Sequence, residues 1–301
     1  MKKMCDELVQ AVQAKMGEEY EVTVNEVMKV NDTKKTGLTI SKVGEEQQGI
    51  HPIVYIDDLA CEVCDGSTSI DDAVQKVIEL YESADADEVV AEGDISNIFQ
   101  NADDCLSRVR LRIVNKNLCK KMLADKVSRD FLDLVIYYQI NVREDSNGFA
   151  SVPVTVGLAK MLGVTEDDLY TAAINNMKGE EVVEDMATVL NKLIGEDDDR
   201  CIEENGFGAP PMLVITNKSG VYGASQMMNQ DVMDQISRML GNCYIIPSSI
   251  HELIALPLDT TSRNDLKSLI CEVNEGHVME DEVLSDHPYI FDATKKELVV
   301  A

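Results

Sequence analysis

The side chains with the types needed for catalysis gather near the carboxyl end of the sequence. They are Ser248, Ser249, His251, Glu252, Asp286 and His287. A serine hydroxyl, an imidazole that accepts its proton and a carboxylate that orients the imidazole are the components of nucleophilic hydrolysis. The spacing is unspecific, because no Gly-x-Ser-x-Gly elbow precedes a helix. The second histidine of a His-Glu-x-x-His zinc motif is also missing. A structural turn is therefore favoured over a hydrolytic or metal site.

A second candidate is the Cys-x-x-Cys pair formed by Cys61 and Cys64. Two thiolates at this spacing can hold a metal ion or exchange a disulfide. A structural zinc site usually needs another such pair, and His51 is the only adjacent candidate ligand. A thioredoxin-like site needs its first cysteine at a helix N-terminus, whereas we expect this pair between a strand and a loop. We interpret the pair as two free thiols and predict no metal and no cofactor.

The composition is strongly acidic. In 301 residues, 27 Lys plus Arg stand against 55 Asp plus Glu, which gives a net charge of −28. Hydrophobic residues make up 45% of the sequence, so this charge accompanies an ordinary globular core. Direct binding of nucleic acid or of an anionic membrane is disfavoured, because both depend on Lys and Arg. We expect a basic protein as partner.

The sequence predicts a cytoplasmic protein. Cys5, Asp6 and Glu7 interrupt any apolar segment of a signal peptide at the start. The longest apolar stretches are much shorter than the ~18 residues that suggest a membrane-spanning helix. Eight cysteines in so long a chain are typical of reduced thiols rather than of a disulfide framework.

Apolar periodicity indicates the elements that must position these side chains. Apolar residues that recur three or four positions apart predict helices at 5–16, 70–81, 166–177, 182–194, 229–240 and 263–275. Alternation predicts strands at 20–25, 36–43, 52–56, 109–114, 132–142, 149–156, 212–216, 243–246 and 251–256. Ser69 and Thr165 are expected to cap their helices, and Gly276 is expected to end the last one. A terminal hairpin is expected around residues 292–296.

These elements predict an α+β fold with mixed, largely antiparallel sheets and packed helices. Charge, glycine and proline coincide after residue 196, which indicates a boundary there. We therefore predict a larger N-terminal lobe at 1–200, an acidic Gly/Pro linker at 201–211 and a smaller C-terminal α+β lobe at 212–301.

Several segments resemble a family of uncharacterised proteins from Gram-positive anaerobic bacteria. They are residues 129–138, 211–225, 240–254 and 283–289. The likeness extends over most of the chain and implies a full-length cytosolic bacterial protein. The family is a domain of unknown function, so the resemblance implies no activity, substrate or catalytic residue. It identifies the turn at 247–252 as a landmark of the last lobe.

The leading functional hypothesis is a non-enzymatic interaction or regulatory protein with an acidic surface, since no complete catalytic or cofactor motif is present. One alternative is a hydrolase that uses the histidine-rich end of the last lobe. It requires His251 or His287 to lie in a cleft within hydrogen-bond reach of a serine or carboxylate. A second alternative is an acidic mimic of nucleic acid, which requires carboxylates spaced like phosphates along one face.

Overall fold

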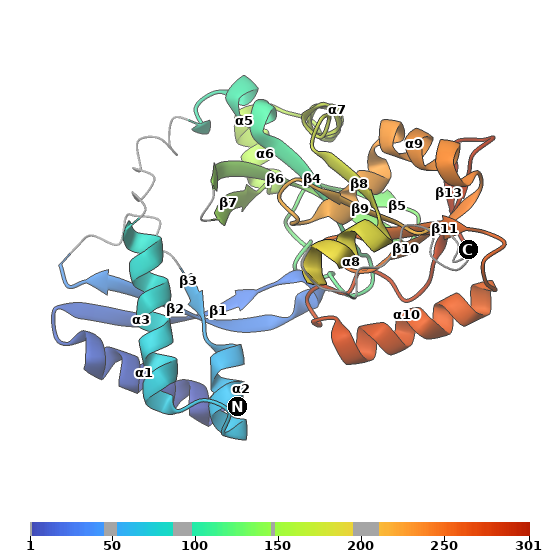
Figure 1. Ribbon diagram of the computed structural model, residues 1–301. Helices are drawn as coiled ribbons and strands as arrows, with labels where there is room; N and C mark the ends of the chain where they lie inside the picture. Colours follow the sequence, from blue (N-terminus) through green and yellow to red (C-terminus); the bar gives the residue numbers. More distant parts are fainter. Residues whose placement is uncertain (1, 45–52, 87–97, 146–147, 195–210) are drawn as a thin grey trace. The chain divides into compact units, whose positions relative to one another are not determined.

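The computed structural model describes residues 2–44, 53–86, 98–145, 148–194 and 211–301. Within these residues the strands form sheets of three, four and six strands, accompanied by helices (Figure 1). Every strand pairing with a defined register is antiparallel. The predicted α+β class is therefore confirmed.

The chain divides into two compact units. The first comprises Met1–Lys29, Thr33–Asn101 and Val142–Ala150, and the second comprises Val30–Asp32, Ala102–Asn141 and Ser151–Ala301. This division differs from the predicted lobes at 1–200 and 212–301. The reason lies in strand β8 (Glu181–Asp185), which pairs with β9 (Leu213–Asn217). One sheet thus contains strands from both sides of the predicted linker. Residues 201–210 of that linker lie outside the described part of the chain.

The first unit is a three-stranded sheet with helices that share its core. Its elements are α1 (Lys2–Met16), β1 (Tyr20–Met28), β2 (Lys34–Lys42), β3 (Ile53–Tyr55), α2 (Asp57–Asp65) and α3 (Ile70–Ala86). Leu8 on α1, Leu38 on β2 and Val77 on α3 are fully buried in one cluster. Ser69 accepts a hydrogen bond from the Asp72 backbone N–H at 3.1 Å, so the predicted helix cap is confirmed.

A second sheet has the strand order β4-β6-β5, with β7 also paired to β6. Its strands are β4 (Val109–Asn115), β5 (Ser128–Phe131), β6 (Leu134–Asp145) and β7 (Gly148–Pro153), and the accompanying helices are α5 (Ala102–Arg108), α6 (Val156–Leu162) and α7 (Glu166–Asn176). Thr165 caps α7 as predicted, and together with Asp168 it forms a capping box. The hydrogen bonds from Thr165 lower the pKa of the Asp168 carboxyl.

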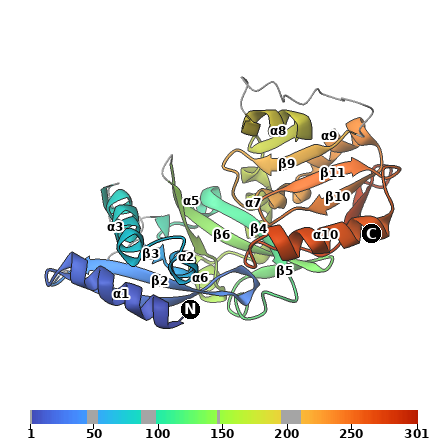
Figure 2. The same cartoon turned by 60° about the horizontal axis from the view of Figure 1, so that its bottom comes forward.

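The six-stranded sheet has the order β13-β12-β10-β11-β9-β8. Its remaining elements are α8 (Met186–Ile194), η3 (Gly223–Met228), α9 (Gln230–Leu240), β10 (Cys243–Pro247), β11 (Leu253–Pro257), α10 (Arg263–His277), β12 (Tyr289–Asp292) and β13 (Glu297–Val300). Figures 1 and 2 show α9 and α10 on opposite sides of this sheet. Strand β10 is buried along its whole length, as expected for a central strand covered on both faces.

Two helix predictions differ from the structure. Residues 182–194 were expected to form one helix, but β8 occupies 181–185 and the helix begins at Met186. Val182 and Val183 are β-branched, and pairing with β9 outweighs the helical spacing. Gly276 does not end α10, which continues to His277. Its φ is not in the left-handed region that a glycine C-cap uses.

Candidate functional site

A pocket of about 390 Å³ lies in the second unit between α10 and the six-stranded sheet. This volume is in the range of small-molecule sites, roughly 300–1,000 Å³. Aliphatic side chains form most of its wall. The sheet contributes Ile246, Ile254 and Leu256, and the helix contributes Leu266, Leu269, Ile270 and Val273.

Local sequence explains both walls. Strands β10 and β11 pair with Ile246 opposite Ile254 and Tyr244 opposite Leu256, so these side chains lie on the same face. On α10, Leu266, Leu269, Ile270 and Val273 recur at helical spacing and therefore form one stripe. Ser262 begins the helix by accepting a hydrogen bond from the Asp265 N–H at 3.2 Å. The cap thus determines where the stripe starts relative to the sheet.

The polar side chains of the pocket separate into two groups. Thr260, Thr261 and Asp265 come from the connection after β11 and the first turn of α10. Ser248 and Asn274 also line the pocket. Ser248 directly follows β10, whose last residue, Pro247, pairs with the first residue of β11, Leu253. Ser248 therefore lies close to the start of β11. Helix α10 follows β11 in the chain and runs back toward that end. The pocket therefore has polar groups at both ends and an aliphatic middle.

Thr260 carries an unpaired polar atom. Its Oγ1 is buried and has no hydrogen-bond partner among the described residues. A buried hydroxyl without a partner costs about 1–3 kcal/mol. A change of χ1 rotamer moves Oγ1 by about 120° about the Cα–Cβ bond, and we infer that one such rotamer turns the hydroxyl toward the pocket. A ligand hydrogen-bonding group there would remove this cost.

The predicted serines do not meet an imidazole ring. The Ser248 hydroxyl donates to a Glu252 carboxylate oxygen at 3.1 Å. The Ser249 hydroxyl oxygen accepts from the backbone N–H of His251 at 2.9 Å. No hydrogen bond joins either hydroxyl to an imidazole in the described part of the chain, so the nucleophile–base contact of a hydrolase is missing there. The segment forms the turn that the sequence favoured.

Both ring nitrogens of His251 have other partners. Nδ1 accepts the backbone N–H of Tyr222 at 3.1 Å, so it carries no proton. Nε2 lies 3.4 Å from a Glu282 carboxylate oxygen and therefore carries the ring proton. The ring positions the chain before η3, where Tyr222 has a φ of 56°.

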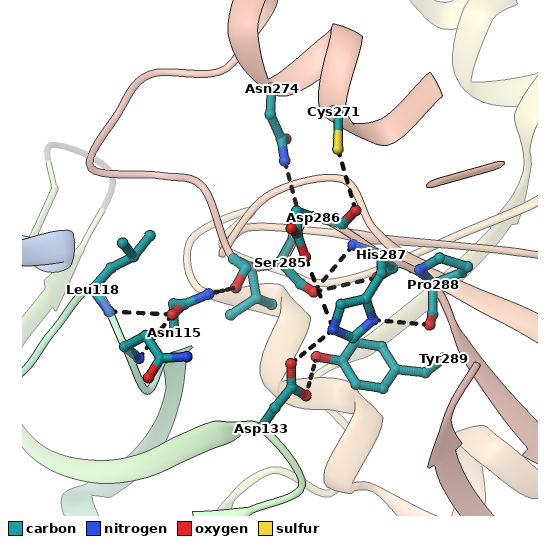
Figure 3. A network of polar contacts seen from close by, with 12 residues as sticks. Asn115, Leu118, Asp133, Cys271, Asn274, Ser285, Asp286, His287, Pro288 and Tyr289 are labelled. Atoms are coloured by element: carbon teal, nitrogen blue, oxygen red, sulfur yellow. Dashed lines mark hydrogen bonds and ion pairs between the residues drawn. The ribbon is translucent and has the colours of Figure 1, made fainter. Parts of the chain in front are cut away.

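His287 belongs to a separate polar network (Figure 3). Its Nε2 lies 2.7 Å from Asp133, whose other oxygen accepts from the Tyr289 hydroxyl at 2.8 Å. Its Nδ1 lies 3.1 Å from the Pro288 carbonyl oxygen. Both ring nitrogens thus face acceptor oxygens. Burial, as the larger cause, and the bond to Asp133 hold the pKa of Tyr289 above its ordinary value.

The network in Figure 3 ties the loop before β12 to α10 and to β4. Asn274 donates to the Ser285 carbonyl at 2.9 Å, and Asn115 donates to the Leu284 carbonyl at 3.1 Å. Asp286, the remaining predicted residue, lies with an oxygen 4.0 Å from Nε2 of His287, beyond hydrogen-bond distance. These contacts make the network a structural anchor of the loop.

Cys61 and Cys64 lie on helix α2, not between a strand and a loop as expected. Asp57 and Asp58 in the first turn and Gly66 with a left-handed φ of 81° at the end are the local signals for this helix. Neither cysteine forms a disulfide among the described residues, and His51 lies outside them. Among the described side chains, no group of three or more His, Cys, Asp or Glu could hold a metal ion.

No helix in the described ranges is long and apolar enough to cross a membrane. A family model described as a family of unknown function, DUF5688, matches residues 1–293. The chain belongs to this family. The expected resemblance to a family of unknown function is confirmed, and membership brings no activity with it. The comparisons with curated proteins and with solved structures gave no match.

For this DUF5688 chain, sequence reasoning missed the pocket because no single motif marks it. Of the predicted site residues in the described ranges, only Ser248 lines it. The available signal was the position of Leu269, which extends the stripe of α10 beyond the buried Leu266 and Ile270. With 54% of its surface exposed, Leu269 lies at the edge of the apolar wall.

Proposed function

We propose that this protein is a non-enzymatic, ligand-binding regulatory protein. The observation that carries the proposal is the aliphatic pocket of about 390 Å³ between α10 and the six-stranded sheet. An apolar cavity with a few polar groups is the usual form of a small-molecule site. The hydroxyls and imidazoles predicted for hydrolysis have other partners, which favours binding over catalysis.

The construction of the pocket supports a regulatory role. Its two walls belong to different elements, so a bound molecule would contact α10 and the sheet together. On α10, only Leu266 and Ile270 are buried. A ligand would therefore add a substantial share of the apolar contact that holds α10 in place, and its binding energy would stabilise the folded unit.

Binding of the neutral dye Nile red tests this proposal. Its fluorescence rises in apolar surroundings, and we expect a saturable increase with one dye per chain. Leu269→Trp places a large ring at the mouth of the pocket and should weaken binding at least tenfold. Leu80→Trp on α3 is the matched control, because Leu80 is 49% exposed and lies outside the pocket. Equal binding by both variants, or no saturable binding to the unmodified protein, would contradict the proposal.

The acidic charge supports a basic protein as the regulated partner. An excess of 55 acidic over 27 basic residues would speed association with a positively charged surface, at a rate that falls with salt. Capture at low and at moderate salt, followed by rate measurements with the purified partner, tests this part. A rate that is independent of salt would contradict it.

The cysteines support a cytoplasmic setting. Seven cysteines in the described ranges form no disulfide, as is typical of a reducing compartment. We place the protein in the cytoplasm of a Gram-positive anaerobic bacterium. Fractionation of such cells, with recovery of the protein in the membrane or culture fluid, would overturn this assignment.

A further inference from the structure

The geometry of the pocket points to one class of ligand: a neutral or cationic amphiphile of medium length, with its polar group at the end formed by Thr260, Thr261 and Asp265. Anionic amphiphiles are disfavoured. This inference rests on the proposed function and specifies the chemistry of its ligand.

The charge of the lining is the first argument. Asp265 is the only ionisable side chain among the described residues that line the pocket. The cations nearest to it in sequence, Arg263 and Lys267, are not part of the lining. A carboxylate or phosphate group at this end would meet a like charge, and none of the described lining residues is a cation that compensates it. An ammonium group would meet an opposite charge, and a hydroxyl would meet no penalty.

The start of α10 does not reverse this preference. A helix N-terminus attracts anions through its unpaired N–H groups. Here the Ser262 side chain accepts the Asp265 N–H, and the Ser262 hydroxyl donates to the Asp265 carboxylate at 2.6 Å. The side chains of Ser262 and Asp265 therefore cap this helix end, and the Asp265 carboxylate adds negative charge there.

The Thr260 hydroxyl is the second, independent argument. It is buried without a hydrogen-bond partner in the described ranges and belongs to the same end of the pocket as Asp265. After rotation about χ1 it can donate to or accept from a ligand hydroxyl, and it can accept from an ammonium group. Both ligand types in the proposal supply the partner that this atom lacks.

The helix wall limits the length of the ligand. From Leu266 to Asn274 the wall spans about 12 Å, at about 1.5 Å per residue. The aliphatic side chains lie between these positions, and the Asn274 amide donates to the Ser285 carbonyl at the far end. A chain of medium length fills the aliphatic middle without passing this polar end.

Competition against Nile red tests the inference with three probes that share one chain: decanol below its solubility limit, and decylamine and decanoate below their critical micelle concentrations, all at pH 7. We expect decanol and decylamine to displace the dye and decanoate to be weaker by about fivefold or more. Asp265→Asn should bring decanoate close to decanol and reduce the affinity for decylamine. Asp231→Asn is the matched control, because Asp231 lies in the first turn of α9, outside the pocket.

The outcomes separate the inference from the proposed function. Saturable dye binding with equal displacement by all three probes, or with decanoate the strongest, overturns the ligand class and leaves the pocket function standing. An equal response of the Asp265 and Asp231 variants overturns the role of Asp265. Absence of saturable dye binding overturns the function and the inference together. Thr260→Val should weaken decanol but not Nile red, and equal loss of both contradicts the role of the hydroxyl.

Discussion

Two segments pack against the same six-stranded sheet in different ways. The segment from η3 through α9, residues 223–240, is closely packed: Gly223, Ala224, Ser225, Gln226 and Met227 are all buried. Val232, Met233 and Ile236 on α9 are buried as well. Helix α10 buries only Leu266 and Ile270 and leaves a pocket against the sheet.

The difference separates stability from binding within one unit. Closely packed interiors lose stability when their volume changes by as little as one methylene group. A region that leaves space against its neighbours tolerates added volume and can accept a ligand. We therefore infer that the η3–α9 segment holds the fold and that α10 provides the adjustable wall. Substitutions of the same type on the two sides test this assignment.

The largest expected effect is that of Gly223→Ala. An added Cβ would lie 2.5 Å from the His251 carbonyl oxygen and 2.8 Å from the Asn217 nitrogen, both backbone atoms that cannot move easily. We expect a loss of about 3 kcal/mol or more in the free energy of unfolding. Gly276→Ala in α10 meets nothing within 4 Å and should stabilise by about 0.5–1 kcal/mol. Urea unfolding of both variants measures this, and similar values would refute the comparison.

Alkaline pH should lower the free energy of unfolding through Cys243, which is fully buried on β10. Burial raises the pKa of this thiol from 9.0 to about 12. In the unfolded chain the thiol ionises near its ordinary value, so the stability that its neutral form provides is complete below pH 9. It is lost as pH rises from 9 toward 12, by about 1.4 kcal/mol per pH unit. The free energy of unfolding, measured between pH 8 and pH 11, should show this slope.

Cys243→Ala is the control for this pH dependence. The variant is expected to be less stable at neutral pH, because it leaves a small cavity. Its stability should nevertheless fall less steeply above pH 9, since the ionisable group has been removed. An unchanged slope would show that other groups account for the alkaline loss.

A pair of valines compares the two helices by added volume. Val232 on α9 is 1% exposed, whereas Val273 on α10 lines the pocket. Val232→Leu should cost about 1–3 kcal/mol through overpacking. Val273→Leu should change the free energy of unfolding by less than about 0.5 kcal/mol and should lower the affinity for Nile red. An equal loss of stability in both variants would mean that the pocket wall on α10 is as rigid as the η3–α9 segment.

The local sequence was sufficient for elements with strong end signals. Helix α9 spans Gln230–Leu240, close to the predicted 229–240. Asn229 accepts the Asp231 N–H at its start, and Gly241 follows its last residue. Helix α7 has the predicted cap at Thr165. In both cases the contacts that define the helix join residues a few positions apart, so the sequence alone contains the relevant physics.

Elements that depend on distant partners could not be predicted in this way. Residues 181–185 form a strand because β9, which begins at Leu213, pairs with them. The partner of His287 is Asp133, which is 154 positions away. The pocket depends on the distance between α10 and the sheet, and apolar periodicity reports which face is buried but not how closely it is packed. The ligand site was therefore beyond the reach of motif reasoning.

Two threonines provide the finest test, because one hydroxyl has a hydrogen-bond partner and the other has none among the described residues. The Thr216 hydroxyl, beside Gly223, donates to the His251 carbonyl at 2.9 Å, whereas the buried Thr260 Oγ1 has no partner in the described ranges. Thr216→Val leaves that carbonyl without this donor and should cost about 1–2 kcal/mol. Thr260→Val removes an unpaired polar atom at nearly constant volume, so it should be neutral or stabilise by up to about 1 kcal/mol. Chemical unfolding without ligand measures both, and a clear loss in Thr260→Val would show that its hydroxyl is already satisfied and not available to a ligand.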